Sequence, residues 1–147
     1  MTTKFIYDFI TKNKYAVLST VSEKGMPQSA LVGIAVTRDL KIIFDTVTSS
    51  RKYKNLIINP AIAFVIGWDD EQTVQYEGTA RIPKDQQLDE LLAVYFEVFP
   101  DGRDRKENWK DISYFYVEPR WIRYSNFNEP VQIEEMEFWV DNWLLLI

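Results

Sequence analysis

The segment richest in polar chemistry spans residues 44–52 and reads Phe-Asp-Thr-Val-Thr-Ser-Ser-Arg-Lys. Its hydroxyl side chains precede two adjacent cations, Arg51 and Lys52, at the predicted start of a helix. The first turn of a helix presents unpaired N–H groups and the positive end of the helix dipole, so hydroxyls and cations there suit a phosphate. The same spacing also fits a serine that only caps the helix while both cations point into solvent.

The residue types that are missing exclude several classes of chemistry. The 147 residues include no His and no Cys. A Ser-His-Asp or Cys-His nucleophile system and a disulfide are therefore excluded, and a structural zinc site loses its usual ligands. We expect no metal site and no catalytic side chain. Any redox chemistry would have to come from a bound cofactor.

The charge is divided unevenly along the chain. The net charge is −5, but residues 1–128 hold 17 basic and 17 acidic residues, while residues 129–147 hold five acidic residues and no basic one. The acidity argues against a nucleic-acid partner, whereas the neutral body can still bind a small anion locally. Apolar runs fall well short of the roughly 20 residues that span a bilayer, and no secretory signal is visible. We therefore expect a soluble, cytoplasmic protein without a membrane partner.

Apolar periodicity and turn residues predict a mainly β chain with short helices. Strand 61–68 is apolar at nearly every position, which favours burial on both faces. Residues 101–111 are polar and predicted to be irregular. A closed or nearly closed antiparallel barrel would protect the strand edges best. The expected helices begin near residues 3, 51 and 85, and the expected strands span residues 15–21, 27–37, 41–46, 61–68, 73–82, 112–117 and 121–124.

The chain divides into a predicted barrel domain, residues 1–128, and an acidic, aromatic extension, residues 129–147. The extension is too apolar to be a free tail. We expect it to pack on the barrel or on a second copy of the chain.

Several motifs, in this order, resemble the pyridoxamine 5'-phosphate oxidase-like split-barrel family. They are Gly-x-Pro at 25–27, Phe-x-Thr-x-x-x-Ser-Arg-Lys at 44–52, Asn-Leu at 55–56, Asn-Pro at 59–60 and Gln-Tyr-Glu-Gly at 75–78. The likeness covers about residues 11–125. It implies a six-stranded antiparallel split β-barrel that binds FMN at the interface of a homodimer.

The resemblance also implies roles for individual residues. Thr46 and the backbone of Asp45 would line the ribityl and phosphate side of FMN. Ser50, Arg51 and Lys52 would hold its phosphate, in agreement with the need of a dianion for paired cations.

Three further residues would reach the flavin ring. The resemblance implies that Gln75 hydrogen-bonds the polar edge of the isoalloxazine, where an amide can both donate and accept. Trp121 and Arg123 would reach the flavin of the other subunit. A core tryptophan and a surface arginine remain an equally simple interpretation of these last two residues.

Two departures separate the chain from the true oxidase of this family. Ala30 and Ala35 stand where that oxidase places basic residues, and residues 129–147 lack the Arg and His that grip its phosphorylated substrate. We therefore predict no oxidation of vitamin B6 compounds.

The activity that remains is that of an FMN-dependent reductase, which passes hydride from a nicotinamide nucleotide to a small acceptor. Three alternatives stay open: a non-catalytic FMN carrier of the general-stress type, a deazaflavin-binding relative, and a member that has lost its cofactor. Haem is disfavoured because the usual axial His and Cys are absent.

Overall fold

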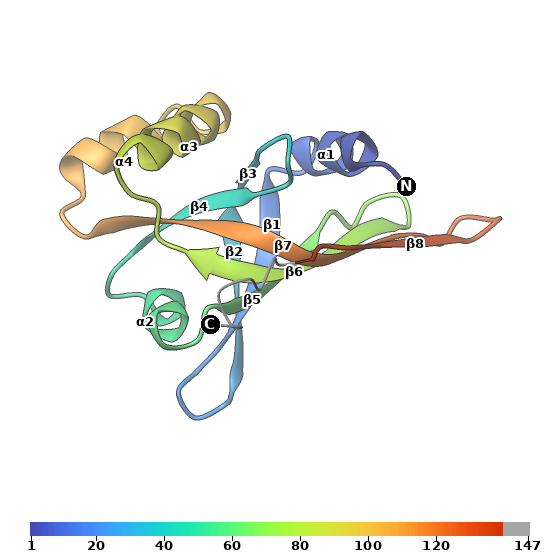
Figure 1. Cartoon of the computed structure of the whole chain (residues 1–147), viewed down its shortest axis with the longest axis horizontal. Helices are drawn as coiled ribbons and strands as arrows, with labels where there is room; N and C mark the ends of the chain where they lie inside the picture. Colours follow the sequence, from blue (N-terminus) through green and yellow to red (C-terminus); the bar gives the residue numbers. More distant parts are fainter. Residues whose placement is uncertain (140–147) are drawn as a thin grey trace, which may run out of the picture.

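The computed structural model describes residues 1–139, whose eight strands form one curled antiparallel sheet (Figure 1). The order is β2-β1-β5-β6-β7-β4-β3, and β8 pairs with β7 outside this order. The sheet curls into a half-barrel, which confirms the expected split barrel, with eight strands rather than six. The strands are β1 (Tyr15–Val21), β2 (Pro27–Gly33), β3 (Ala35–Val36), β4 (Ile42–Val47), β5 (Ala61–Ile66), β6 (Gln72–Arg81), β7 (Ile112–Asn126) and β8 (Gln132–Glu137).

The sheet curls because one predicted strand changes partners halfway. The segment expected as a single strand at 27–37 breaks at Ile34, whose N–H donates to the Lys14 carbonyl at 2.8 Å. Before the break, β2 pairs with β1, and after it β3 pairs with β4. The two ends of the sheet are therefore joined by one residue, while β2 and β4 are not neighbours in the sheet order. The opening between β2 and β4 is the split of the barrel.

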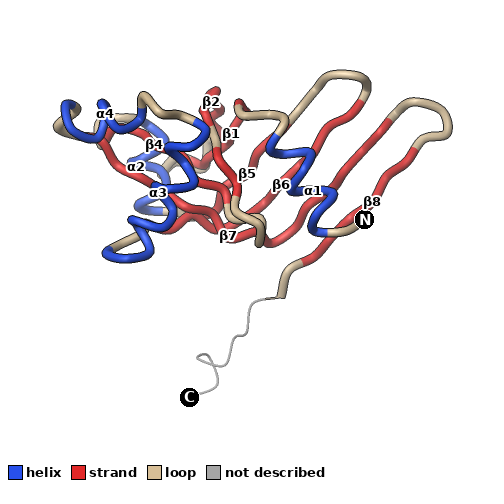
Figure 2. The backbone as a smooth tube through the Cα atoms, turned by 90° about the horizontal axis from the view of Figure 1, so that it is seen from above, coloured by secondary structure: helices blue, strands red, loops and turns tan. Residues whose placement is uncertain are grey.

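Three helices lie where the sequence predicts them: α1 (Thr3–Thr11), α2 (Arg51–Ile58) and α3 (Asp85–Val98). The prediction of an irregular segment at 101–111 is wrong, because it contains α4 (Gly102–Asn108). An ion pair between Asp101 and Arg105, one helical turn apart at 2.7 Å, supports this polar helix. In Figure 2, α2, α3 and α4 gather at one end of the sheet and β8 lies at the other.

The prediction that β5 is buried on both faces is also wrong. Ile62, Phe64 and Ile66 point into the core, whereas Ala61 and Val65 are exposed on the outer face. Nothing among residues 1–139 covers that face of β5. An apolar run that suggested a fully buried strand thus leaves apolar side chains on the surface.

The two closing strands predicted on either side of Glu118 and Pro119 are one continuous strand, β7. The proline is tolerated because the pairing with β6 shifts there: Gly78 faces Pro119, Glu77 faces Trp121, and Arg120 is the extra residue of a bulge. At Gly78 a Cβ atom would lie 2.5 Å from the Glu118 carbonyl oxygen, so only glycine fits.

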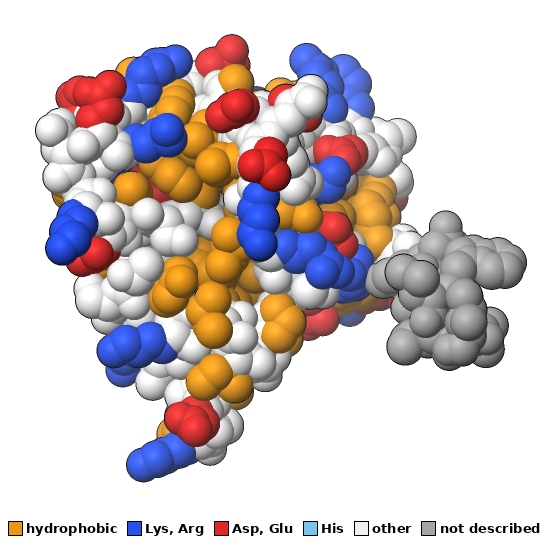
Figure 3. Space-filling model, turned by 60° about the vertical axis from the view of Figure 1, so that its left-hand side comes forward, with side chains coloured by type: hydrophobic (Ala, Val, Ile, Leu, Met, Phe, Trp, Pro, Cys, Tyr) orange, Lys and Arg blue, Asp and Glu red, His pale blue; other side chains and the backbone are white. Residues whose placement is uncertain are grey.

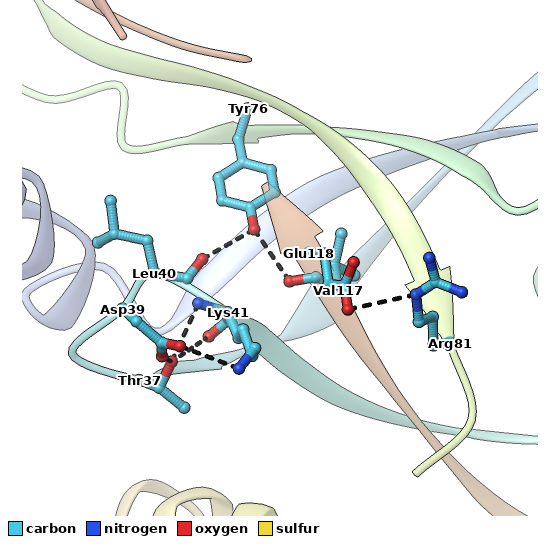
Figure 4. Close-up of polar contacts among 8 residues, drawn as sticks. All are labelled: Thr37, Asp39, Leu40, Lys41, Tyr76, Arg81, Val117 and Glu118. Atoms are coloured by element: carbon cyan, nitrogen blue, oxygen red, sulfur yellow. Dashed lines mark hydrogen bonds and ion pairs between the residues drawn. The ribbon is translucent and has the colours of Figure 1, made fainter. Parts of the chain in front are cut away.

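The barrel interior contains a hydrogen-bonded tyrosine, Tyr76 (Figure 4). Its hydroxyl lies 2.8 Å from the Leu40 carbonyl oxygen and 3.1 Å from that of Val117. Burial raises the pKa of Tyr76 well above its usual value, so the hydroxyl stays a donor. The contact ties the β3–β4 turn, where Leu40 has a φ of 67°, to β7.

The C-terminal extension begins with β8, which pairs with the second half of β7. Residues 132–137 of the extension therefore lie alongside β7, while the division of the chain at residue 128 stays a prediction. The apolar residues of the extension at 140–147 lie outside the described residues. No helix within residues 1–139 has the length and apolar character needed to cross a membrane.

Candidate functional site

The start of α2 carries the hydroxyls and cations that the sequence singles out. The Ser50 hydroxyl accepts a hydrogen bond from the Tyr53 N–H at 3.2 Å and lies 2.8 Å from the Thr46 hydroxyl. Ser50 therefore caps the helix and also joins it to the end of β4. The capping interpretation is thus right for the serine, but it leaves the role of the two cations open.

Arg51 and Lys52 form no ion pair with the described residues. Arg51 is exposed, whereas Lys52 is half-buried. Burial lowers the pKa of the Lys52 ammonium, against the opposing effect of the nearby Asp45 carboxylate. A half-buried ammonium without a close counter-ion is costly, and an anionic ligand would relieve that cost.

Lys52 stands between two hollows. The larger, of about 290 Å³, lies at the split of the barrel, and we name it the β2–β4 groove. Thr46, Ser50 and Lys52 line it at the α2 side, and Leu31 lines it from β2. The smaller, of about 120 Å³, is lined by Arg51, Lys52 and Ala30 among others. Lys52 thus lines both hollows, and Arg51 lines the smaller one.

Of the two alanines that replace basic residues, the structure places only one near the cations. Ala30 lines the smaller hollow beside Arg51 and Lys52. Ala35 is buried under α3, in a hydrophobic cluster with Tyr95 and Phe99. The loss of positive charge next to the candidate phosphate position is therefore limited to Ala30.

Asp45 lines the β2–β4 groove, but its carboxylate is already engaged. Arg105 of α4 donates from Nε to Asp45 Oδ2 at 3.0 Å and pairs with Asp101 on its other side. A third donation, at 3.3 Å, reaches the hydroxyl of Tyr95, whose pKa is raised by burial and by the Asp45 charge. Arg105 therefore neutralises the carboxylate nearest to the cations, a role that the sequence analysis missed because 60 residues separate the partners.

Gln75, Trp121 and Arg123 lie elsewhere, on the outer face of the sheet. Gln75 faces Arg123 across β6 and β7, and Gln75 and Trp121 line a hollow of about 200 Å³ that shares no lining residue with the β2–β4 groove. A single chain therefore does not bring the eight predicted site residues together. They fall into two groups, one at the start of α2 and one on β6 and β7, which we name the first and the second half-site of the predicted site.

A glutamate of β8 forms hydrogen bonds with two residues of the second half-site. Glu135 accepts hydrogen bonds from the Arg123 guanidinium, at 2.9 Å from Nε, and from the Trp121 Nε1 at 3.4 Å. The other guanidinium nitrogen, Nη2, lies 2.7 Å from the same carboxylate. The sequence analysis did not identify Glu135, because only the pairing of β8 with β7 brings it opposite Arg123.

The largest of these hollows, of about 430 Å³, also opens on the outer face. Its lining includes the apolar residues Val21, Ala61 and Ala63. Two charged residues, Glu77 and Arg120, also line it. It shares Ser19, Ala63 and Glu77 with the hollow of the second half-site, so the two are continuous. The outer face thus combines a hollow with exposed apolar side chains, a feature of association surfaces.

Comparison with known proteins identifies related folds. Residues 2–126 match the sequence model of a family described as pyridoxamine 5'-phosphate oxidase. No curated protein sequence matches the chain. Three similar solved structures share only 14–21% identity and therefore show the fold alone.

The first is a haem-binding protein from Mycobacterium smegmatis, with a TM-score of 0.77, 14% identity and coverage of 93% of this chain. This chain spans only 58% of the length of that protein. The haem storage protein HutZ from Vibrio cholerae has a TM-score of 0.69 and 17% identity, covering 80% of this chain and 89% of that one. General Stress Protein 26 from Bacillus anthracis has a TM-score of 0.69 and 21% identity, covering 92% of this chain and 98% of that one.

Proposed function

This chain belongs to the pyridoxamine 5'-phosphate oxidase family, and from that premise we propose that it is a flavoprotein that binds FMN in the β2–β4 groove. One observation carries the proposal: the half-buried Lys52 ammonium, next to Arg51 at the start of α2, forms no ion pair with the described residues. The FMN phosphate is an anion of suitable size and charge for this position.

The residues of the groove fit the rest of FMN as well. Thr46 and Ser50 offer hydroxyls to a ribityl chain, and Leu31 adds an apolar wall. Arg105 neutralises Asp45, so the carboxylate does not repel the phosphate. In this proposal the chain binds, orients and shields the cofactor.

We further propose a homodimer, because the groove alone is small for FMN. Its volume of about 290 Å³ is at the lower limit for ligand sites, and Gln75, Trp121 and Arg123 lie in a separate hollow. A second copy seated on the outer face would bring its Gln75 half-site to the groove of the first. The exposed Val65 and the apolar lining of the largest hollow support that surface as the interface.

When bound, FMN supplies hydride and electron transfer that no side chain of this protein offers. We propose an oxidoreductase that takes hydride from a nicotinamide nucleotide and reduces a small acceptor. The charged groups near the groove, Lys52 and the Asp45–Arg105 pair, would set the electrostatic environment rather than move protons. Oxidation of a phosphorylated vitamin B6 compound is not proposed, because residues 129–147 contain no cation to hold its phosphate.

Two alternative functions have specific support. The first is a carrier of the general-stress type, which would bind FMN without turning over a substrate; it is compatible with the fold shared with General Stress Protein 26. The resemblance to haem-binding proteins favours haem, but this chain has no His or Cys to serve as the usual axial ligand. A deazaflavin in the same groove is a variant of the first proposal.

A spectroscopic titration tests the proposal and separates these alternatives. We expect the purified protein to bind added FMN saturably, with a shifted visible absorption band, and to bind haemin only weakly. Anaerobic addition of NADH or NADPH should then bleach the flavin band of a reductase, whereas a carrier should stay yellow. A protein that fails to bind FMN, or that prefers haemin, would refute the flavoprotein proposal.

A further inference from the structure

Trp109 is a groove residue that neither the motifs nor the family resemblance identify. It follows α4 directly, and its N–H donates to the Arg105 carbonyl at 2.8 Å. Two residues later, the Asp111 carbonyl accepts from the Thr48 N–H at 3.0 Å, in the loop that leads to α2. The backbone around Trp109 is therefore tied both to the helix that carries Arg105 and to the loop before the two cations.

The side chain of Trp109 faces solvent at the β2–β4 groove. It lines the groove together with Ile112, while Leu31 lines the groove from β2. Trp109 is 52% exposed and Leu31 is 65% exposed, so both walls of the groove present large apolar side chains to water. Among the described residues, Trp109 pairs with no aromatic ring and donates no hydrogen bond from its indole.

The lining of the groove combines two kinds of group. A cation and two hydroxyls line it, and an indole and an exposed leucine line it as well. A ligand that satisfies both parts has an anionic group joined to a flat apolar ring. The indole face offers such a ring offset stacking, with a large contact area and little loss of side-chain freedom.

We propose that Trp109 is a ligand-binding residue, which packs with Leu31 against the flat ring system of the phosphate-bearing ligand. This inference rests on the proposed function, in which that ring is the isoalloxazine of FMN. Arg51 and Lys52 recognise the phosphate, whereas Trp109 recognises the ring. The two contributions are therefore separable with riboflavin, which has the ring but lacks the phosphate.

The experiment is a fluorescence titration of the full chain with FMN and with riboflavin. We expect Trp109→Ala to weaken the binding of both ligands by the same factor, about five- to tenfold. Trp109→Phe should restore most of the affinity, because it keeps a ring face. Trp68→Ala is the matched control, since Trp68 is 56% exposed but lies in the connection between β5 and β6, and it should leave both affinities unchanged.

The possible outcomes are distinguishable. Wild-type affinity in Trp109→Ala, or a loss confined to FMN, would overturn the role of Trp109 while leaving the flavoprotein proposal intact. A wild-type protein that binds neither ligand would overturn both. Thermal unfolding, measured alongside, should show that Trp109→Ala, Trp109→Phe and Trp68→Ala are all folded. A loss of affinity in Trp109→Ala alone then cannot come from unfolding.

Discussion

Three basic residues in the first half of α2 differ in where their side chains lie, and this difference decides which of them can hold a phosphate. Lys52 lines both hollows and Arg51 lines the smaller one, whereas Lys54 is exposed and lines neither. The helix dipole acts similarly on all of them, because they share the first turn or its end. Position relative to the groove, rather than charge alone, therefore separates them.

The double variant Arg51→Ala/Lys52→Ala should weaken FMN binding by about 30- to 1,000-fold, because it removes two charge-assisted contacts to the phosphate. Riboflavin affinity should change little. Isothermal titration calorimetry measures both. Lys54→Ala, the control on the same helix, should bind FMN like the wild type. A loss of FMN affinity in Lys54→Ala as large as in the double variant would show that only the net charge of the helix matters.

The affinity for FMN should fall as the buffer becomes alkaline. The fall should begin at a lower pH than it would if the phosphate were held by an exposed lysine. Burial lowers the pKa of Lys52 in the free protein, and a bound phosphate favours its charged form. Affinity is then constant below the lowered pKa and declines above it, as the ammonium loses its proton. The slope should disappear in Lys52→Ala and with riboflavin; a profile that is identical in the variant would contradict this role.

At the residue scale, the sequence predicts the local motif but not its long-range partners. Thr46, Ser50, Arg51 and Lys52 lie within seven residues, so one strand and one helix start suffice to place them. Arg105 contacts Asp45 beside the groove, and Trp109 lines the groove itself. Both residues are placed there by α4, which the polar composition of residues 101–111 concealed. Their signal was the Asp101–Arg105 spacing of one helical turn, which fits an exposed helix.

The elements around the split of the barrel are held in place by contacts that bridge distant parts of the chain. Helix α4 binds β4 through the Asp45–Arg105 pair, and both side chains are only 19% exposed. A partly buried pair of this kind loses more when one partner is removed than an exposed pair does, because the remaining charge is left uncompensated.

Arg105→Gln should therefore destabilise the fold by about 1–3 kcal/mol and also weaken FMN binding. The second effect follows because the freed Asp45 carboxylate would face the phosphate. Chemical denaturation and an FMN titration measure the two effects. Asp45→Asn in the Arg105→Gln background should recover FMN affinity. Lys106→Ala on the same helix should change neither stability nor FMN affinity. A double variant that binds FMN as weakly as Arg105→Gln alone would refute the electrostatic explanation.

The close packing at the β6–β7 bulge gives a prediction about the stability of the protein. Gly78→Ala should destabilise the protein by about 1–3 kcal/mol, because its Cβ atom would meet the Glu118 carbonyl oxygen. Thermal unfolding measures the change. Thr79→Ala, at the neighbouring position, should cost clearly less, and equal stability of Gly78→Ala and wild type would show that the strands can shift apart freely.

Most elements follow from periodicity, and the errors share a physical cause. Residues 15–21 mix apolar and Ser/Thr positions and form β1 as predicted, because a local pattern determines a local strand. The break at Ile34 and the continuity of β7 through Pro119 depend on which strand lies alongside, which a single sequence does not state. The same applies to the burial of β5, which depends on what covers its outer face.

At the scale of the whole molecule, the residues of the proposed site are divided between two half-sites. The residues that the family resemblance assigns to FMN occupy two hollows without a common lining residue. On the face drawn in Figure 3, hydrophobic side chains form a band between charged ones, which is unusual for a surface that meets only water. A homodimer accounts for both observations together.

A charge placed on the outer face should therefore separate the subunits and weaken FMN binding. Val65→Asp introduces a carboxylate at a 41% exposed position of β5. Sedimentation velocity should show a dimer for the wild type and a monomer for the variant. Ile82→Asp is matched in exposure, at 42%, but follows β6 on the opposite side of the pleat, and it should stay dimeric. A wild type that sediments as a monomer with FMN bound would contradict the two-chain site.

The most direct test is a calorimetric titration of the full chain with FMN, repeated on Arg51→Ala/Lys52→Ala and on Lys54→Ala. The account predicts saturation at one FMN per chain for the wild type and for Lys54→Ala, with binding strongly weakened in the double variant. No saturable binding by the wild type, or binding that the double variant leaves unchanged, would contradict it.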